Sequence, residues 1–277
     1  SGEDEGVQIF GGADVTNTGA GTIAITGTAN GATTDDRGVE IGDTGTTVSS
    51  DSGMITISGT ANNGGDGVRL NDSAAVQSNS GNISLTGVSG DDDGVEIEDG
   101  ADVTTGGAGT ITIMGTANGN DVDDNAVIIE DSGTTVSSVN GLIQITGTAN
   151  GDGGDGVELF NDASISSTGI GGVTIMGTSN STGSEDGVKI DSGMISTNSG
   201  AIMITGMNGD DGVEIDEDNG SSDPQITSTS GNISITGSTT DDDGVKIEDG
   251  ADVTTGGTGT ISVCLLYTSP SPRDLWI

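Results

Sequence analysis

Runs of aspartate before glycine are the part of this sequence best suited to chemistry. The two longest runs precede Gly94 and Gly244, and they consist of Asp91, Asp92 and Asp93, and of Asp241, Asp242 and Asp243. Calcium takes oxygen ligands from carboxylates, so both runs are candidate calcium loops, and calcium is the cofactor that the sequence suggests. Neither run fits the EF-hand loop, which ends on a bidentate glutamate. A solvated acidic turn is therefore the competing interpretation.

The acidic residues are not spread evenly over the chain. The formal net charge is −39, with 44 Asp and Glu against 5 Lys and Arg, and there is no His. Except for Asp51 and Asp274, every acidic residue lies in the loop before a recurring Gly-Val-x-Ile tetrad, within the tetrad, or in the turn after it. So large a negative charge argues against nucleic acid and anionic membranes as partners. No apolar stretch approaches the length of about 18 residues that membrane insertion requires.

The tetrad is the first element of a pattern that the chain repeats nine times. Each repeat continues with a lone Val or Ile and ends with Ile-x-Ile or a close variant. The tetrads begin 25 to 32 residues apart, at Gly6, Gly38, Gly67, Gly94, Ala126, Gly156, Gly187, Gly212 and Gly244. This period indicates a solenoid, a propeller or an array. Propeller blades usually carry aromatic signatures, and residues 1–263 contain only Phe10 and Phe160, which favours a solenoid.

Aliphatic residues two positions apart indicate short strands with one buried face. Each repeat therefore contributes three strands and five inward aliphatic side chains, separated by the residues that favour turns. One such unit cannot bury its apolar face alone, whereas stacked units form a closed core. We predict an all-β fold, a parallel β-helix solenoid of nine coils with three short strands per coil of about 30 residues. The general chirality of parallel crossovers predicts a right-handed coil.

The fourth repeat makes this prediction specific. The residues expected in its core are Val95, Ile97, Val103, Ile111 and Ile113. Glu96 and Thr112 alternate with them and should be exposed. Stacking would also place equivalent carboxylates of successive coils roughly 4.8 Å apart, where like charges repel. We therefore expect high salt, or calcium held between the loops of adjacent coils, to offset this repulsion.

Catalysis has little support in the sequence. Parallel β-helices include polysaccharide lyases and glycosidases, and such lyases typically use Arg or Lys as the base. Here the basic residues before the last 14 residues lie on four different coils: Arg37, Arg69, Lys189 and Lys246. Carboxylates that might act as acid and base recur in every coil, whereas an active site interrupts a repeat at one place. We predict no enzymatic activity, and a polysaccharide-active enzyme is kept as the remote alternative.

The repeats resemble those of known bacterial surface proteins. The segments that carry the resemblance are Gly231–Gly237 (GNISITG) and Asp243–Val253 (DGVKIEDGADV). They are similar to repeats in very large secreted and surface proteins of the filamentous-haemagglutinin or adhesin kind. The resemblance implies a non-catalytic adhesive stalk, extracellular or on the cell surface, that is part of a longer protein. It also implies that the partner is an extracellular surface or a polysaccharide or protein receptor. Neighbouring coils of the same longer chain are the other expected partner.

Two regions depart from the repeat. Cys264–Asp274 resembles the in-frame translation of a transposase-type sequencing adaptor, so we expect residues 1–263 to be the β-helix and residues 264–277 to be a non-native tail. The turn at residues 216–224 is longer than its counterparts in the other coils. A calcium-dependent ligand-binding module is the alternative to a stalk, and this longer turn is where we expect its ligand to bind.

Overall fold

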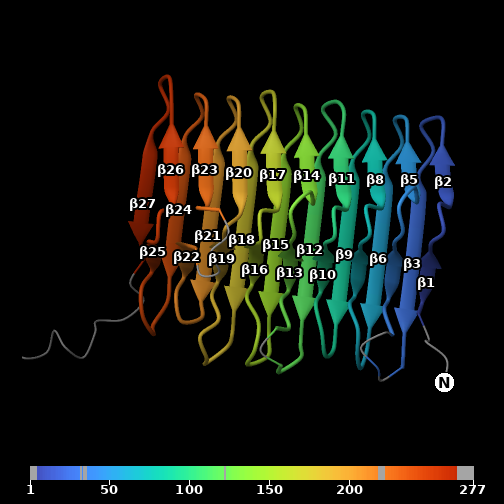
Figure 1. Cartoon of the computed structure of the whole chain (residues 1–277), viewed down its shortest axis with the longest axis horizontal. Helices are drawn as coiled ribbons and strands as arrows, with labels where there is room; N and C mark the ends of the chain where they lie inside the picture. The colour runs from blue at the N-terminus through green and yellow to red at the C-terminus, as the bar shows by residue number, and fades with distance from the viewer. Residues whose placement is uncertain (1–4, 32, 34–35, 122, 218–221, 267–277) are drawn as a thin grey trace, which may run out of the picture.

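The computed structural model describes residues 5–31, 33, 36–121, 123–217 and 222–266. They form 27 strands in three parallel sheets of nine strands each. The strands stack as a rod in which every coil adds one strand to each sheet (Figure 1). The prediction of a nine-coil parallel β-solenoid is therefore confirmed.

Each of the three sequence elements forms one of the sheets. The tetrads form the first sheet, which consists of β1 (Val7–Ile9), β4 (Val39–Ile41), β7 (Val68–Leu70), β10 (Val95–Ile97), β13 (Val127–Ile129), β16 (Val157–Phe160), β19 (Val188–Asp191), β22 (Val213–Asp216) and β25 (Val245–Ile247). The lone aliphatic residues lie in the second sheet, which consists of β2 (Asp14–Asn17), β5 (Thr47–Ser50), β8 (Ala75–Ser78), β11 (Asp102–Thr105), β14 (Thr135–Ser138), β17 (Ser164–Ser167), β20 (Met194–Thr197), β23 (Gln225–Ser228) and β26 (Asp252–Thr255). The Ile-x-Ile segments begin the strands of the third sheet, which consists of β3 (Ile23–Ala29), β6 (Ile55–Ala61), β9 (Ile83–Ser89), β12 (Ile111–Ala117), β15 (Ile143–Ala149), β18 (Val173–Ser179), β21 (Ile202–Asn208), β24 (Ile233–Ser238) and β27 (Ile261–Leu265).

The strands of the third sheet are longer than the Ile-x-Ile pattern alone predicts. In β12 the strand continues past Ile113 to Ala117 and includes Gly115. A Cβ atom at Gly115 would lie 1.7 Å from the carbonyl oxygen of Ala126, so only glycine permits this close approach of two backbones. Glycines of the neighbouring coils pair with Gly115 in register. The corner between the third and first sheets is therefore equally tight in successive coils.

The core consists of aliphatic ladders that run along the rod. Ile111 pairs in register with Ile83 in the preceding coil and with Ile143 in the following coil, and all three are buried. The residues predicted for the core of the fourth repeat are all fully buried, namely Val95, Ile97, Val103, Ile111 and Ile113. The apolar alternation in the sequence therefore predicts the register of this repeat correctly.

The prediction that Glu96 is exposed is wrong. Thr112 is partly exposed, as its outward position predicts, but only 8% of the Glu96 surface is accessible. The Glu96 side chain alternates with the buried Val95 and Ile97, yet a neighbouring coil covers it, because Arg69 Nε lies 3.0 Å from Glu96 Oε2. Alternation predicts the side of the strand on which a residue lies, but not how far neighbouring side chains cover it.

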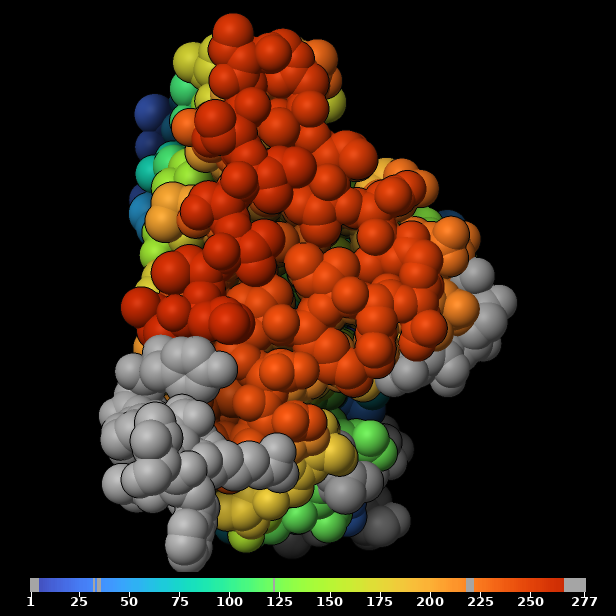
Figure 2. Space-filling view, turned by 90° about the vertical axis from the view of Figure 1, so that its left-hand side faces the viewer, coloured from blue at the N-terminus to red at the C-terminus, as the bar shows by residue number. Residues whose placement is uncertain are grey.

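The last coil differs from the inner coils in its burial. Figure 2 views the rod from its C-terminal end, where this coil overlies the preceding ones. Ile247, Ile261 and Val263 are exposed there, although their counterparts in the inner coils are buried, because no further described strand packs on them. No helix in the described part of the chain is long and apolar enough to cross a membrane.

Candidate cation-binding face

Most of the buried charge lies on the outer side of the first sheet. We call this surface the charged face, and define it as the third residue of each tetrad together with the residues directly before and after the tetrad. All four basic residues that the structure describes belong to it, namely Arg37, Arg69, Lys189 and Lys246. They lie on four coils in the sequence, and stacking brings them onto one surface.

Acidic and basic residues alternate along the central column of this face. The third residues of the tetrads pair in register from coil to coil in the order Gln8, Glu40, Arg69, Glu96, Ile128, Glu158, Lys189, Glu214 and Lys246. Opposite charges on directly paired residues attract each other. The expected repulsion between carboxylates of successive coils is therefore wrong for this column, where Ile128 alone interrupts the alternation from Glu40 to Lys246.

Arg69 neutralises several carboxylates at once. Its guanidinium group lies 3.0 Å from Glu96 Oε2 and 3.8 Å from Asp66 Oδ2, and it also contacts Glu98. Burial alone would lower the pKa of Arg69, but the negative charges of Glu96 and Asp66 outweigh burial and raise it. The sequence analysis missed this role, although the signal was present, because Arg69 occupies the same tetrad position as Glu96.

The aspartates directly before the tetrads form a ladder with a structural role. Asp93 Oδ1 accepts a hydrogen bond from the backbone N–H of Asn125 at 2.6 Å, and Asn125 Oδ1 accepts one from the N–H of Asp155 at 2.7 Å. Asp211 Oδ1 accepts in the same way from the N–H of Asp243 at 2.8 Å. Because Asn125 serves as well as an aspartate, the ladder requires an acceptor oxygen and not a charge. The recurring Asp-Gly pair therefore has a reason that is independent of metal binding.

The two predicted calcium loops differ in their surroundings despite their identical sequences. Asp91 is exposed, Asp92 is half-buried and Asp93 is buried, whereas Asp241, Asp242 and Asp243 are all exposed. The loop at residues 91–93 is covered by the coil that follows it, but β25 is the last strand of its sheet. None of the metal-compatible carboxylate clusters in the described residues contains a member of the loop at residues 241–243.

A cavity of about 400 Å³ opens on the charged face beside Ile128. Its lining includes six carboxylates, from Asp92, Asp93, Glu96, Asp123, Glu130 and Glu158. Asn125, Ile128 and Phe160 complete the lining, and no described basic residue takes part in it. The cavity therefore lies at the position in the central column where Ile128 stands in place of a positively charged residue.

Burial strongly disfavours the charged forms of the carboxyl groups around this cavity. It raises the pKa of Asp92 and of Glu130 to about 7. It raises the pKa of Glu96 to about 10 even though Arg69 acts against it, and it raises the pKa of Glu158 well above its usual range. Binding of a proton or a cation therefore stabilises these buried groups, and one divalent ion can replace several protons.

Carboxylates from adjacent coils approach one another closely enough to share a cation in five places. In each group one oxygen of every member lies within 4.8 Å of the others, and the groups are Asp66–Asp93–Glu96, Glu96–Glu98–Glu130, Glu98–Asp99–Asp131, Asp186–Asp211–Glu214 and Glu214–Asp216–Glu248. Of the predicted ligands, only Asp93 belongs to such a group. The sequence analysis missed the others because it sought ligands within one loop, whereas the groups join neighbouring coils.

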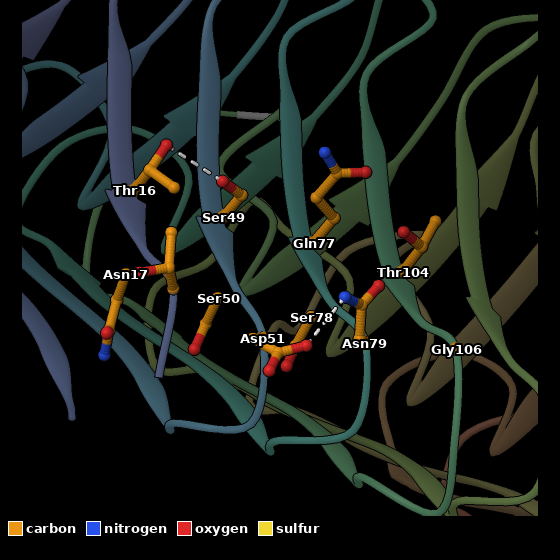
Figure 3. A pocket seen from close by; sticks show the side chains of 11 residues that line it. Thr16, Asn17, Ser49, Ser50, Asp51, Gln77, Ser78, Asn79, Thr104 and Gly106 are labelled. Carbon is orange, nitrogen blue, oxygen red and sulfur yellow. Dashed lines mark hydrogen bonds between the residues drawn. The ribbon is translucent and has the colours of Figure 1, made fainter. Parts of the chain in front are cut away.

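A second cavity, of about 490 Å³, lies on the outer side of the second sheet and has a different character (Figure 3). Hydroxyl and amide side chains line it, and many of them bond to each other across coils. Thr16 Oγ1 lies 3.1 Å from Ser49 Oγ, and Asn79 Nδ2 donates to Asp51 Oδ1 at 3.0 Å. No aromatic residue lines this cavity, so it lacks the stacking surface on which sugars commonly rest. Residues 218–221 of the longer turn lie outside the described residues.

No protein-family model, curated protein or solved structure matches this chain. The assignment of the β-solenoid fold therefore rests on the structure. Function has to be argued from the charged face and from the uniformity of the coils.

Proposed function

We propose that the chain is a non-catalytic structural segment, a β-helical stalk of a bacterial surface or secreted protein with an adhesive role. The observation that carries this proposal is the unbroken register of three nine-stranded sheets along the whole described rod. A continuous hydrogen-bonded rod keeps its ends apart at a fixed distance, which is what a stalk requires. The resemblance of the repeats to adhesin-type proteins supports the same role.

The contacts of the basic residues argue against the enzyme alternative. A lyase needs a basic side chain that can reach substrate, but Arg37 contacts Glu40 and Asp66, and Arg69 contacts Glu96. Lys246 contacts Glu214 and Glu248. These side chains neutralise carboxylates of their own rod.

The carboxylate-lined cavity favours a second candidate, the calcium-dependent ligand-binding module. This cavity lies beside Ile128, where six carboxylates line it without a described basic residue. Its site would lie on the charged face, and not in the longer turn at residues 216–224 where the sequence analysis placed it. A ligand recognised there would carry positive charge or arrive through a bridging cation.

Removal of single coils separates these two functions. Deleting residues 94–125 removes one coil at the cavity, and deleting residues 38–66 removes one coil away from it. If the chain is a stalk, each deletion shortens the rod by one strand spacing of about 4.8 Å in solution scattering, and attachment of displayed chains to protein- or polysaccharide-coated surfaces persists. Loss of attachment after the first deletion alone would contradict the stalk and establish the binding module.

A further inference from the structure

Three carboxylates of the last third of the rod meet in a buried position on the charged face. Asp186 directly precedes the tetrad that forms β19, and Asp211 directly precedes the tetrad that forms β22, to which Glu214 belongs. One oxygen of each lies within 4.8 Å of the other two, and all three residues are buried. We call these residues the Asp186 cluster.

One oxygen of the Asp186 cluster has no partner of its own. Asp186 is only 1% exposed, and its Oδ1 accepts a hydrogen bond from the backbone N–H of Asp211 at 2.8 Å. Its Oδ2 is buried as well but has no hydrogen-bond partner among the described residues. A buried carboxylate oxygen left unsatisfied destabilises a fold by about 1–3 kcal/mol or more. Such an atom among two further carboxylates points to a positively charged ligand.

The equivalent cluster nearer the N-terminus shows what this position requires. Asp66, Asp93 and Glu96, the Asp66 cluster, lie at the same tetrad positions. There Asp66 Oδ2 lies 3.0 Å from Arg37 Nε and 3.8 Å from Arg69 Nη1. Two guanidinium groups thus occupy the space beside the oxygen that corresponds to Asp186 Oδ2.

At the Asp186 cluster, neither of the two corresponding positions holds an arginine. Asp155 occupies the position of Arg37, and Lys189 occupies the position of Arg69. The Lys189 ammonium group lies 3.7 Å from Glu214 Oε2, and Lys246 also contacts Glu214. Asp186 Oδ2 accepts no hydrogen bond from either ammonium group, and Asp155 adds a further negative charge near Asp186.

We propose that Asp186, Asp211 and Glu214 bind one calcium ion, which takes the place that arginine side chains occupy in the Asp66 cluster. Calcium binds oxygens at about 2.3–2.6 Å, so two ligands on opposite sides of the ion lie about 5 Å apart. The three oxygens lie within 4.8 Å of one another, close enough to share one ion, and magnesium is seldom held by protein ligands alone because it usually keeps several of its waters. Water completes the coordination shell. The site is independent of the stalk and module functions, because it lies in other coils than the cavity beside Ile128.

The test is calcium titration of the full chain by calorimetry near neutral pH, with magnesium as a second probe. Asp186→Asn keeps the Oδ1 acceptor for the Asp211 N–H but removes the charged ligand, so calcium affinity at this site should fall about tenfold or more. Asp66→Asn makes the same change in the cluster that already contains arginine and should leave calcium binding unchanged. Equal binding by wild type and Asp186→Asn, or an equal loss in both variants, would overturn the proposal.

A second variant tests the same site by filling it. Asp155→Arg copies Arg37 of the Asp66 cluster and should abolish the calcium binding that Asp186→Asn weakens, at some loss of stability because Asp155 Oδ1 accepts a hydrogen bond from the Asp186 N–H. Undiminished calcium binding in folded Asp155→Arg would contradict the proposal. A proton shared between Asp186 and Glu214 is the other way to satisfy the buried oxygen. Infrared spectroscopy detects such a proton as a protonated-carboxyl band, which is assigned to Asp186 if Asp186→Asn removes it. If this band is unchanged at about 10 mM calcium, the calcium site is overturned.

Discussion

The Asp66 and Asp186 clusters lie at equivalent positions four coils apart, yet guanidinium groups contact the first aspartate only in the Asp66 cluster. Arg37 approaches Asp66 to 3.0 Å, whereas Asp155 occupies the corresponding position beside Asp186. Two outward positions, those of Arg37 and Arg69, therefore determine whether guanidinium groups neutralise the cluster. In a solenoid the outer face can vary in this way from coil to coil, because the inward ladders that stabilise the fold remain the same.

Removing the guanidinium group of Arg69 from the Asp66 cluster should have the largest effect on stability. Arg69→Met leaves the carboxylates of Asp66, Glu96 and Glu98 without this partner, and breaking such buried pairs costs about 3–5 kcal/mol. Denaturant unfolding without calcium measures the loss. Arg37 still contacts Asp66 in this variant, so the loss should arise mainly from Glu96 and Glu98.

The matched change in the other cluster is Lys189→Met, which should cost less. Lys189 lies 3.7 Å from Glu214, and Lys246 still contacts that glutamate. If Lys189→Met destabilises the rod as much as Arg69→Met does, the two clusters are not neutralised in different ways, and the comparison between them fails.

The pH dependence of stability should be the next largest effect. Burial raises the pKa of Asp92 and Glu130 to about 7 and that of Glu96 to about 10. In the folded chain these groups keep protons that the unfolded chain has already released, so their stabilising contribution is fully present below the unfolded pKa and is lost as the pH rises through the folded values. Thermal melting in calcium-free buffer should therefore give a midpoint at about pH 5 that is roughly 5 °C or more above that at about pH 8. Equal midpoints at the two pH values would mean that folding does not raise the pKa of these carboxyl groups.

The smallest effect is expected where the central column lacks a positive residue. Ile128→Lys places an ammonium group between Glu96 and Glu158 and restores the alternation, which should stabilise the chain by about 0.5–1 kcal/mol. Ile128→Met is the neutral control and should leave stability nearly unchanged. Chemical denaturation at about pH 8, where more of the carboxyl groups are ionised, compares the two. A lysine variant no more stable than the methionine variant would show that the alternation contributes nothing.

The fold could be predicted from the sequence because aliphatic spacing alone determines which side chains face the core. Val95 and Ile111 illustrate this, since each lies in a ladder of aliphatic residues from adjacent coils. The burial of Glu96 could not be predicted in the same way, because it depends on Arg69 in the preceding coil.

The candidate site was only partly predictable from the sequence. Aspartate before glycine indicated the correct surface, but Asp186 and Asp211 meet only when coils of unequal length are stacked in register. The exposure of Asp243 shows a further limit, because the same sequence at Asp93 is buried by the coil that packs on it. Aligning the tetrads residue by residue would have revealed the alternating charges in advance.

The central claim is that the carboxylates of the charged face require cations, and that the Asp186 cluster takes calcium specifically. The most direct measurement is thermal melting of the wild-type chain and of Asp186→Asn in calcium chloride and in sodium chloride of equal ionic strength. Calcium should raise the midpoint of the wild-type chain above that in sodium chloride, and the excess should be smaller in Asp186→Asn, since ionic strength acts only through screening. Superimposable wild-type curves in the two salts would contradict the claim and leave screening as the only effect of cations on the rod.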